Sequence, residues 1–355
     1  MSIYEDKEGL FKASSDWSKH CRYEIEGELI VPKEGPLKRY NPLDYYKNPL
    51  TIEMVEEIFG KKKKRNTDMF IHTSFASLDV TNEQEILNWV NTFGLPFVPF
   101  LKVDDKERKQ IYESKKNVFF PHDIKNLYRK TQEFTLPRPN ISRNPLLKEG
   151  IIWETEGIYI EEVKEEIRRV KYILELKEAK DKSDFSSLSK TALEIVSYWQ
   201  LYTPEYQQNI AQDLIFSAAT DHYIVDTFNM ALRNVRPLIF FENGEGEWGW
   251  HFDALLAAIY IMFSIDMTES KIPQKCKYVN CNTYFKATTE ANVYCSTQCQ
   301  DNAKTYRARE KKKRESRKLW QVGKTAEEII VLINVEPYRL KGWINKWEAE
   351  NGRKY

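Results

Sequence analysis

Before position 276 the sequence contains only one cysteine, Cys21, and nowhere does it contain an apolar run long enough to cross a membrane. The longest such run, residues 254–265, has 12 residues, whereas a spanning helix needs about 20. The N-terminus, MSIYEDKEGL, lacks the basic and apolar pattern of a secretory signal. We therefore expect a globular protein of the reducing cytoplasm without a membrane partner, in which residues 254–265 form a buried helix.

The sequence also lacks the common catalytic motifs. It contains no glycine-rich phosphate loop and no GxSxG nucleophile turn. The five histidines are scattered, at His20, His72, His122, His222 and His251. None falls among the clustered cysteines described next, where a nuclease of the treble-clef type would need one to activate water. We therefore expect that the protein is not an enzyme.

The other four cysteines lie within the stretch CKYVNCNTYFKATTEANVYCSTQC, residues 276–299. Four residues separate Cys276 from Cys281, three separate Cys295 from Cys299, and 13 lie between the two pairs. Such spacing allows all four sulfurs to reach one ion about 2.3 Å away, and four thiolates complete a tetrahedral shell. The pattern predicts one structural Zn²⁺ ion. The alternatives are four reduced cysteines without metal, or two transient disulfides.

A helix is expected to follow the second pair directly. Residues 292–296 read as a short strand that leads to an N-cap at Ser296. From Thr297 to about Lys318 the sequence has no glycine or proline and is rich in good helix formers. Cys299 would then lie in the first helical turn. A cysteine knuckle, a hairpin and a helix that carries the last ligand make the treble-clef arrangement.

Charge is distributed unevenly along the chain. Residues 271–355 contain 19 Lys and Arg against nine Asp and Glu, a balance of +10, and residues 1–270 contain 35 against 44, a balance of −9. This asymmetry indicates a partner that carries phosphates. We predict nucleic-acid contacts from nine cations of the helix, and a solvated helix face is the alternative. The nine are Lys304, Arg307, Arg309, Lys311, Lys312, Lys313, Arg314, Arg317 and Lys318.

The segment KCKYVNCNTYFKATTEANVYCSTQCQDNAKTYRARE resembles the CGNR-type zinc finger in its paired cysteines, its Phe four residues after the second cysteine, and its aromatic-Cys-Ser before the last pair. The preceding stretch, FNMALRNVRPLIFFENGEGEWGWHFDALLAAIYIMFSIDMTES, is similar to the end of the ABATE domain. That domain precedes this finger in bacterial proteins regarded as transcriptional regulators. Where the family has Cys-Gly-Asn-Arg, this chain has Cys299-Gln300-Asp301-Asn302. The resemblance implies zinc binding and a role in transcription regulation.

The C-terminal segment predicts two short helices. Helical apolar spacing before the turn NVEP (334–337) is followed by a second apolar face that contains Leu340 and Trp343. Asn334 can adopt the left-handed conformation, and Pro337 suits the first turn of a helix. Such a pair is typical of a helix-turn-helix and resembles that of transposase-like and regulator proteins. Its second helix would offer Tyr338, Arg339, Lys341, Asn345 and Lys346 to the major groove, unless the two helices only pack.

The N-terminal part predicts mostly helices. Residues 82–93 should form one that ends at Gly94, and Ile160, Val163, Ile167, Val170 and Leu174 should form the apolar stripe of another. Residues 235–252 read as a β-hairpin with its turn at NGEG. The expected fold class is therefore mainly α with minor β content. Three parts follow: an acidic, ABATE-like body (1–270, clearest in 190–270), a treble-clef zinc finger with its basic helix (271–318), and a helix-turn-helix (319–355).

Together these patterns predict a DNA-binding transcriptional regulator. The zinc site would fix the start of the basic helix, the basic helix would hold phosphates, and the terminal helix would read bases. From the resemblance, the body would respond to a ligand or form a homodimer. Two alternatives stay open. One is an RNA-binding protein, and the other is a zinc-braced protein-interaction component of a defence or mobile-element system.

Overall fold

The structure of the chain is a computed structural model, which describes residues 17–33, 35–60, 68–96, 157–202, 211–232, 235–242, 245–252, 254–269, 272–287, 289 and 291–351. Helices predominate among these residues and the sheets are small, so the expected mainly helical fold class is confirmed. The described residues form two compact units. The first contains those up to Gln274 together with Thr283–Lys286, and the second contains Lys275–Asn282 and those from Ala287 onward.

The first unit contains short strands that its sequence pattern does not predict. Strand β1 (Trp17–His20) pairs antiparallel with β4 (Leu37–Tyr40). Strands β2 (Tyr23–Glu26), β3 (Leu29–Pro32) and β5 (Ile158–Tyr159) form a three-stranded sheet in that order. Gly157 precedes β5 with a φ of 91°, and a Cβ there would collide with the Ile30 carbonyl. Glycine therefore allows the distant β5 to approach β3 closely.

Four helices follow β4 before the first long gap: α1 (Asp44–Lys47), α2 (Ile52–Phe59), α3 (Ile71–Ser77) and α4 (Glu83–Phe93). The expected helix over 82–93 is confirmed as α4. The Asn82 side chain caps it by accepting a hydrogen bond from the Glu85 amide. Gly94 ends it with a φ of 91°, a value that favours glycine.

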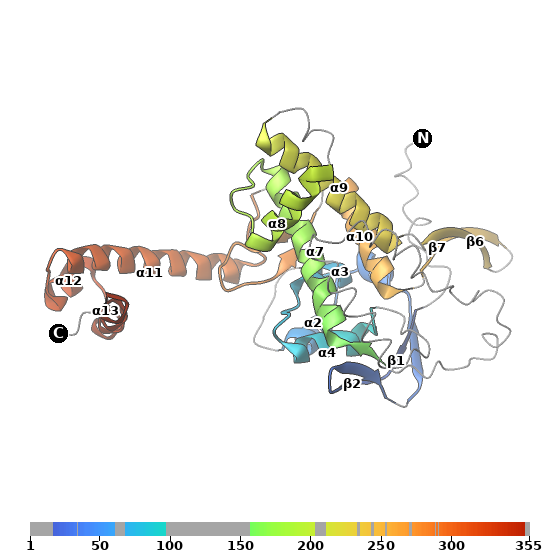
Figure 1. The fold of residues 1–355 in the computed structure, drawn as a ribbon. Coiled ribbons are helices and arrows are strands. Elements are labelled where there is room, and N and C mark those ends of the chain that lie inside the picture. The colour runs from blue at the N-terminus through green and yellow to red at the C-terminus, as the bar shows by residue number, and fades with distance from the viewer. Residues whose placement is uncertain are drawn as a thin grey trace. The chain divides into compact units, whose positions relative to one another are not determined.

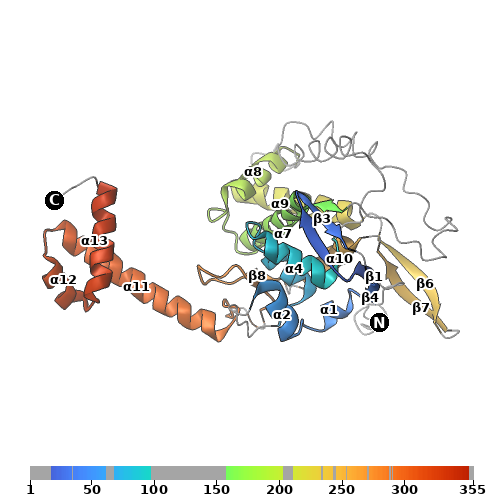
Figure 2. The ribbon, with the colours of Figure 1, turned by 90° about the horizontal axis from the view of Figure 1, so that it is seen from below.

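The longer helices of the first unit pack around one apolar core (Figures 1 and 2). They are α7 (Ile160–Asp181), α8 (Lys190–Trp199), α9 (Gln212–Leu232) and α10 (Leu255–Thr268). The 3₁₀ turn η5 (Gln200–Tyr202) directly follows α8 and has no buried residue. All five residues of the predicted apolar stripe of α7 are buried, which confirms that helix. Figures 1 and 2 show α7 with α9 beside it.

Helix α10 is apolar on almost every side, and ten of its residues are buried. This confirms the expectation that residues 254–265 form a core helix, as an all-round apolar helix must. The hairpin expected over 235–252 is also confirmed, as β6 (Arg236–Glu242) paired antiparallel with β7 (Glu245–His251). Within the described ranges, no helix combines the length and the apolar character that a membrane crossing requires.

A buried polar cluster joins four distant parts of the first unit. Asp266 on α10 is fully buried, and its Oδ2 lies 2.8 Å from His72 Nε2 on α3. Its Oδ1 accepts hydrogen bonds from Tyr46 Oη (2.9 Å) and Lys286 Nζ (2.6 Å). Burial opposes the charge on Asp266, but His72 and Lys286 together hold its pKa below the ordinary value. The carboxylate therefore stays ionised, because each oxygen has a partner.

The same cluster also holds the segment that follows Cys281. Strand β9 (Tyr284–Phe285) pairs with β8 (Gln274–Lys275). The Tyr284 amide donates to Ser77 Oγ at 2.9 Å, and both residues of β9 are buried. Lys286 follows directly and forms the ion pair with Asp266. The second unit adds α11 (Thr297–Gln321), α12 (Ala326–Ile333) and α13 (Pro337–Asn351).

We predict that the stability of the first unit falls as the pH drops below 6.5, the ordinary pKa of histidine, in part because of His72. Burial lowers the pKa of His72, and the charge of Lys286 adds to this, although Asp266 opposes it. Because the pKa of His72 is lower in the folded protein than in the unfolded chain, the unfolded chain takes up a proton at a pH where the native imidazole does not. The contribution of His72 to stability is therefore present above the pKa of the unfolded chain and is lost as the pH falls below it.

The measurement is urea unfolding at about pH 7 and about pH 5.5, with the native protein and a His72→Gln variant. The glutamine amide can still donate to Asp266 but does not titrate. Burial lowers the pKa of His20 and His251 as well, so both proteins should lose stability on acidification. The loss should be smaller in His72→Gln. An equal loss in the two proteins would exclude His72 as a contributor.

Candidate metal centre and basic helix

The four clustered cysteines converge on one point of the second unit. The sulfurs of Cys276, Cys281, Cys295 and Cys299 all lie within 4.8 Å of one another. Cys295 Sγ lies 3.6 Å from Cys281 Sγ and 3.5 Å from Cys299 Sγ. Neither separation fits a disulfide, whose sulfurs are about 2.05 Å apart, and none of the five cysteines, all of which the structure describes, forms one. The four cysteines could therefore hold one metal ion.

The sulfur separations fit a tetrahedral ion. A metal–sulfur distance of about 2.3 Å in a regular tetrahedron gives sulfurs about 3.8 Å apart, close to the observed 3.5 and 3.6 Å. Without a cation the arrangement is unfavourable for thiolates, because hydrogen bonding to Cys281 is the main effect that raises the pKa of Cys276, to about 11. A cation at the centre would reverse this, since coordinated thiols lose their protons.

Local backbone contacts hold the two cysteine pairs together. The Lys277 amide donates to the Val293 carbonyl at 3.0 Å, and the Cys295 amide donates to Cys276 Sγ at 3.4 Å. Residues 292–296 do not form the expected strand. That expectation was wrong because the amide of Cys295 points to a sulfur and is not part of a strand ladder. The strands of this region are β8 and β9.

The start of the helix after the second pair is as predicted. Ser296 is the N-cap of α11, and its Oγ accepts a hydrogen bond from the Cys299 amide at 3.1 Å. Cys299 therefore lies in the first turn, and its sulfur and the helix axis are fixed together. Helix α11 continues to Gln321, so the expected boundary between residues 318 and 319 falls inside it.

The C-terminal helices form a small apolar cluster with the end of α11. Its buried residues are Ile329, Val335, Leu340, Trp343, Ile344 and Trp347, and Leu319 and Trp320 of α11 pack against them. Asn334 ends α12 in the left-handed conformation, with a φ of 51° and a ψ of 60°, as predicted. Figure 2 shows α12 and α13 beside the C-terminal part of α11.

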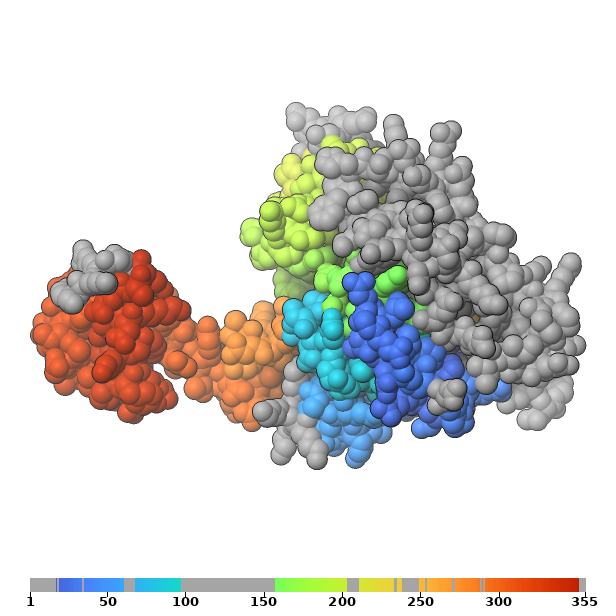
Figure 3. Space-filling model, turned by 60° about the horizontal axis from the view of Figure 1, so that its bottom comes forward, coloured from blue at the N-terminus to red at the C-terminus, as the bar shows by residue number. Residues whose placement is uncertain are grey.

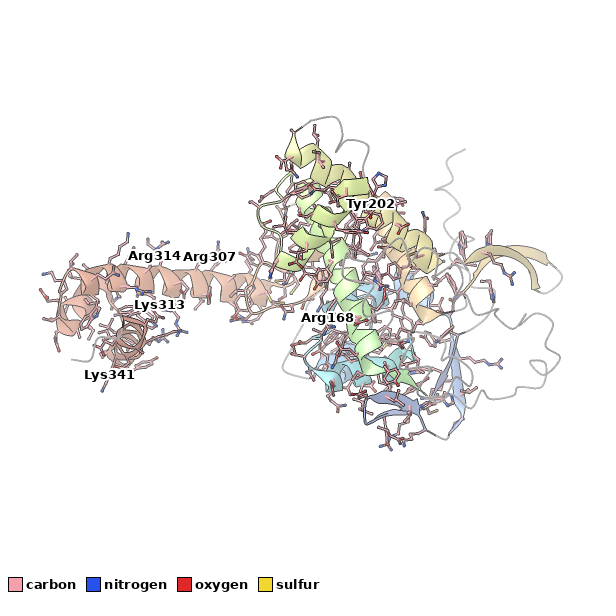
Figure 4. The ribbon with its side chains drawn as sticks, in the orientation of Figure 1. Arg168, Tyr202, Arg307, Lys313, Arg314 and Lys341 are labelled. Atoms are coloured by element: carbon pink, nitrogen blue, oxygen red, sulfur yellow. The ribbon has the colours of Figure 1, made fainter. Side chains whose placement is uncertain are left out.

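Five of the nine predicted cations of α11 lie on one face, which we name the cation stripe. They are Lys304, Arg307, Lys311, Arg314 and Lys318, and all five are exposed. At 100° per residue they fall within a sector of about 80° and cover about 21 Å of the helix axis. Ser316, which is buried, and Trp320 lie on the opposite side, which packs against α12 and α13, and Leu319 lies at the edge of that side. Figure 4 labels Arg307 and Arg314 on α11.

The other four cations of α11 have different surroundings. Lys312 Nζ donates to the Asn334 carbonyl at 2.7 Å, and Arg317 pairs with Glu350 of α13 at 3.1 Å. These two therefore brace the three helices. Lys313 is half-buried, and Arg309 is exposed away from the stripe. In the stripe itself, Lys304 pairs with Asp301 at 3.2 Å across exposed side chains, an arrangement that contributes little stability.

The residues predicted for α13 are all on its surface. Leu340, Trp343, Ile344 and Trp347 face the apolar cluster, whereas Tyr338, Arg339, Lys341, Asn345 and Lys346 are exposed. Arg339 Nε donates to Tyr338 Oη at 2.9 Å. Figure 3 shows the middle of α11 standing clear of α12 and α13 on the face in view. The second unit thus presents two separate polar surfaces, on α11 and on α13.

No family model matches this chain, and no curated protein or solved structure does so either.

We predict that Cys295→Ser abolishes stoichiometric metal binding. Metal affinity should fall by more than the roughly 10- to 100-fold that loss of an outer-shell partner causes. The measurement is metal content per chain by elemental analysis after gel filtration, supported by native mass spectrometry. Cys21→Ser is the matched control, because Cys21 lies outside the group of four. One ion per chain in Cys295→Ser, or metal loss in the control, would contradict this ligand set.

Proposed function

We propose that the protein is a DNA-binding transcriptional regulator. In this proposal the four cysteines hold one structural zinc ion in a treble clef, and α11 holds DNA phosphates. Helices α12 and α13 form a helix-turn-helix that reads base edges. The observation that carries the proposal is the cation stripe, five exposed cations that lie opposite the packed side of α11.

The donor set favours zinc. Four thiolates with sulfurs 3.5 and 3.6 Å apart fit a closed tetrahedral shell, which leaves no position for a water molecule. Such a site would hold shape and would not perform chemistry. Little apolar core surrounds it within the second unit, since Cys276, Cys295 and Ala303 are the buried apolar residues among the described positions 275–282 and 287–310, and the buried β9 belongs to the first unit. Structural zinc, worth about 10–16 kcal/mol in small modules, would supply the missing stability.

The cation stripe suits a nucleic-acid backbone. It covers about 21 Å of the helix axis, and duplex DNA carries one charge per about 1.7 Å of its own axis. Four of the five cations have no acidic partner in the described part of the chain, namely Arg307, Lys311, Arg314 and Lys318. Arg307 uses one nitrogen on the Ala303 carbonyl and keeps others for phosphate. Binding through this face would supply affinity without sequence preference.

The surface of α13 favours DNA over RNA. Five polar or aromatic side chains project from one short helix whose other side is anchored in the apolar cluster. The major groove of B-form DNA admits such a helix, whereas that of A-form RNA is too narrow for side chains to read. The resemblance to the CGNR-type finger and the ABATE domain agrees with this assignment. It also suggests that the first unit responds to a ligand or forms a homodimer.

The deciding experiment is selection from a random duplex library by the zinc-loaded protein at two salt concentrations. An enriched motif with a salt slope of about −4 or steeper in log units would support a sequence-specific DNA regulator. Retention without enrichment would reduce the proposal to non-specific binding, and single-stranded RNA would then be the competitor to test. Absence of retention would refute it.

We predict that changing Arg307, Lys311, Arg314 and Lys318 together to Gln makes the salt slope, which is the slope of log K against log salt concentration, shallower by about 3 to 4. Each phosphate contact contributes about 0.9 to this slope. Affinity for all sequences should fall in parallel, as measured by fluorescence anisotropy with duplex DNA. The control is Lys312→Gln with Arg317→Gln on the braced side. This double variant should lower the thermal stability of the three helices but keep most of the salt slope of the native protein. A salt slope that does not change in the fourfold variant would contradict the phosphate role.

We predict a different result for α13. Arg339→Ala and Asn345→Ala should each lose about 1–3 kcal/mol of discrimination between the selected motif and a single-base mismatch, with a smaller effect on non-specific DNA. Competition titrations with the two duplexes measure this. Lys341→Ala serves as a comparison for a simple charge loss. Equal weakening on both duplexes would assign the two residues to phosphate contacts.

One observation favours a second candidate, a zinc-braced protein-interaction component. On α12, Val331 is 80% exposed and Leu332 is 60% exposed. Contiguous exposed apolar surface marks protein contacts, and these two side chains would contribute to such a surface. In that case neutralising the cation stripe would leave assembly with the partner intact, and the library selection would retain no DNA.

A further inference from the structure

A cationic cavity lies in the first unit, far in sequence from the cysteine site. It has a volume of about 550 Å³ and is lined by residues of the β1–β4 pair, the turn after β1, and helices α1, α2 and α4. Four of the lining residues are cationic, Lys19, Arg22, Lys38 and Arg39, and one is acidic, Glu57. This balance is opposite to that of residues 1–270, which are acidic as a whole.

The register of the β1–β4 pair places two of these lysines directly opposite each other. Lys19 pairs with Lys38, and Ser18 pairs with Arg39. Directly opposed residues project from the same face about 5 Å apart, and like charges there destabilise a sheet. Burial lowers the pKa of Lys19, and the nearby charge of Lys38 lowers it further. An anion between the strands would remove this repulsion.

The protein itself holds Lys19 in this position. Its Nζ donates to the Asn91 carbonyl at 2.7 Å and to the Thr92 carbonyl, both in the last turn of α4. Arg22 pairs with the exposed Glu24 at 2.7 Å. By contrast, no hydrogen bond or ion pair occupies Lys38 or Arg39 within the described ranges, and both are exposed. Lys19 is thus held by the protein, whereas the Arg22–Glu24 pair joins exposed side chains and contributes little stability. Lys38 and Arg39 are available to a ligand.

The remaining wall of the cavity is partly apolar. Tyr40, Tyr45 and Met54 line it, and each is half-buried. The Tyr40 hydroxyl donates to the Phe93 carbonyl at 2.5 Å, which fixes that ring. A volume of 550 Å³ lies within the range of about 300–1,000 Å³ found for small-molecule sites. The cavity therefore offers both a charged rim and a surface for an organic group.

We propose that this cavity binds a small organic phosphate, with Lys38 contacting the phosphate group, Arg39 adding positive charge from the next position of β4, and the tyrosines contacting the organic part. The lining carries a formal excess of three positive charges. A phosphate ester, with a charge of about −1.5 to −2 at neutral pH, matches such an excess better than a single carboxylate does. This site is separate from the cysteine site and from the cation stripe, and it does not depend on the proposed DNA binding.

The test is isothermal titration of the zinc-loaded, full-length protein with pyrophosphate and with ATP, the first probing the charged rim and the second also the tyrosine wall. Variants Lys38→Gln and Arg39→Gln are compared with Lys190→Gln, which removes one exposed cation outside the cavity. Lys38→Gln should weaken binding of both probes by about tenfold or more, as expected for loss of a charge-assisted hydrogen bond, and Arg39→Gln should weaken it by a smaller factor, as expected for loss of a nearby charge. Lys190→Gln should bind like the native protein.

A second measurement separates this role from a structural one. Without ligand, Lys38→Gln should unfold at a slightly higher temperature than the native protein, because the opposed charges are gone. The added stability that pyrophosphate gives the native protein should be lost. Failure of both probes to bind, or equal affinity in Arg39→Gln and Lys190→Gln, would overturn the proposal. A third result would also overturn it: neither probe binds, but a single-stranded oligonucleotide does, and Arg39→Gln weakens that binding. The cations would then serve to bind nucleic acid.

Discussion

The convergence of four sulfurs within 4.8 Å is the constraint on which the second unit depends. Cys276 and Cys281 lie before β9, Cys295 lies just before the N-cap of α11 and Cys299 lies in its first turn, so a shared ion would join them where few apolar contacts exist. Crowded thiols resist ionisation without a cation, as the raised pKa of Cys276 indicates. With an ion the same crowding becomes favourable. An ion bound there would therefore couple the fold of this segment to metal binding.

Cys299 passes that constraint on to α11. Because the cysteine lies in the first turn, a fixed sulfur also fixes the direction in which the helix leaves the site. At the other end, Lys312, Arg317, Leu319 and Trp320 hold the helix against α12 and α13. Between these ends the helix relies on its own propensity, since its Ala, Lys, Arg and Glu residues favour helix without packing. The direction of the cation stripe relative to the cysteine site is thereby defined.

The first unit places charge in a different way. Its buried carboxylate, Asp266, is satisfied from three directions by His72, Tyr46 and Lys286. Removing one partner from such a cluster leaves a buried charge unpaired. The free energy lost in this way is much larger than the net stability that the intact cluster contributes. The cross-strand Lys19 and Lys38 lack a comparable partner on the Lys38 side. The contrast distinguishes a polar group used to hold the fold from one left available for a ligand.

Sequence by itself determined the features that depend on neighbours along the chain. Cysteine spacing, the cap at Ser296, the turn at Asn334, the stripe of α7 and the core helix α10 all follow from periodicity or from the geometry of single residues. The strand expected over 292–296 was wrong because the Cys295 amide bonds to the sulfur of Cys276, 19 residues earlier. Local propensity cannot predict such a partner.

Only the tertiary structure decided which distant residues meet. His72 and Asp266 are 194 positions apart, and Ser77 and Tyr284 are 207 apart. The register that opposes Lys19 to Lys38 depends on the pairing of two four-residue strands with no alternating pattern to reveal it. Likewise, Lys312 and Lys311 are adjacent and identical, yet one braces α12 and the other faces outward. Composition shows how many charges the chain carries, but the packing of its helices and strands decides which of them remain free to bind.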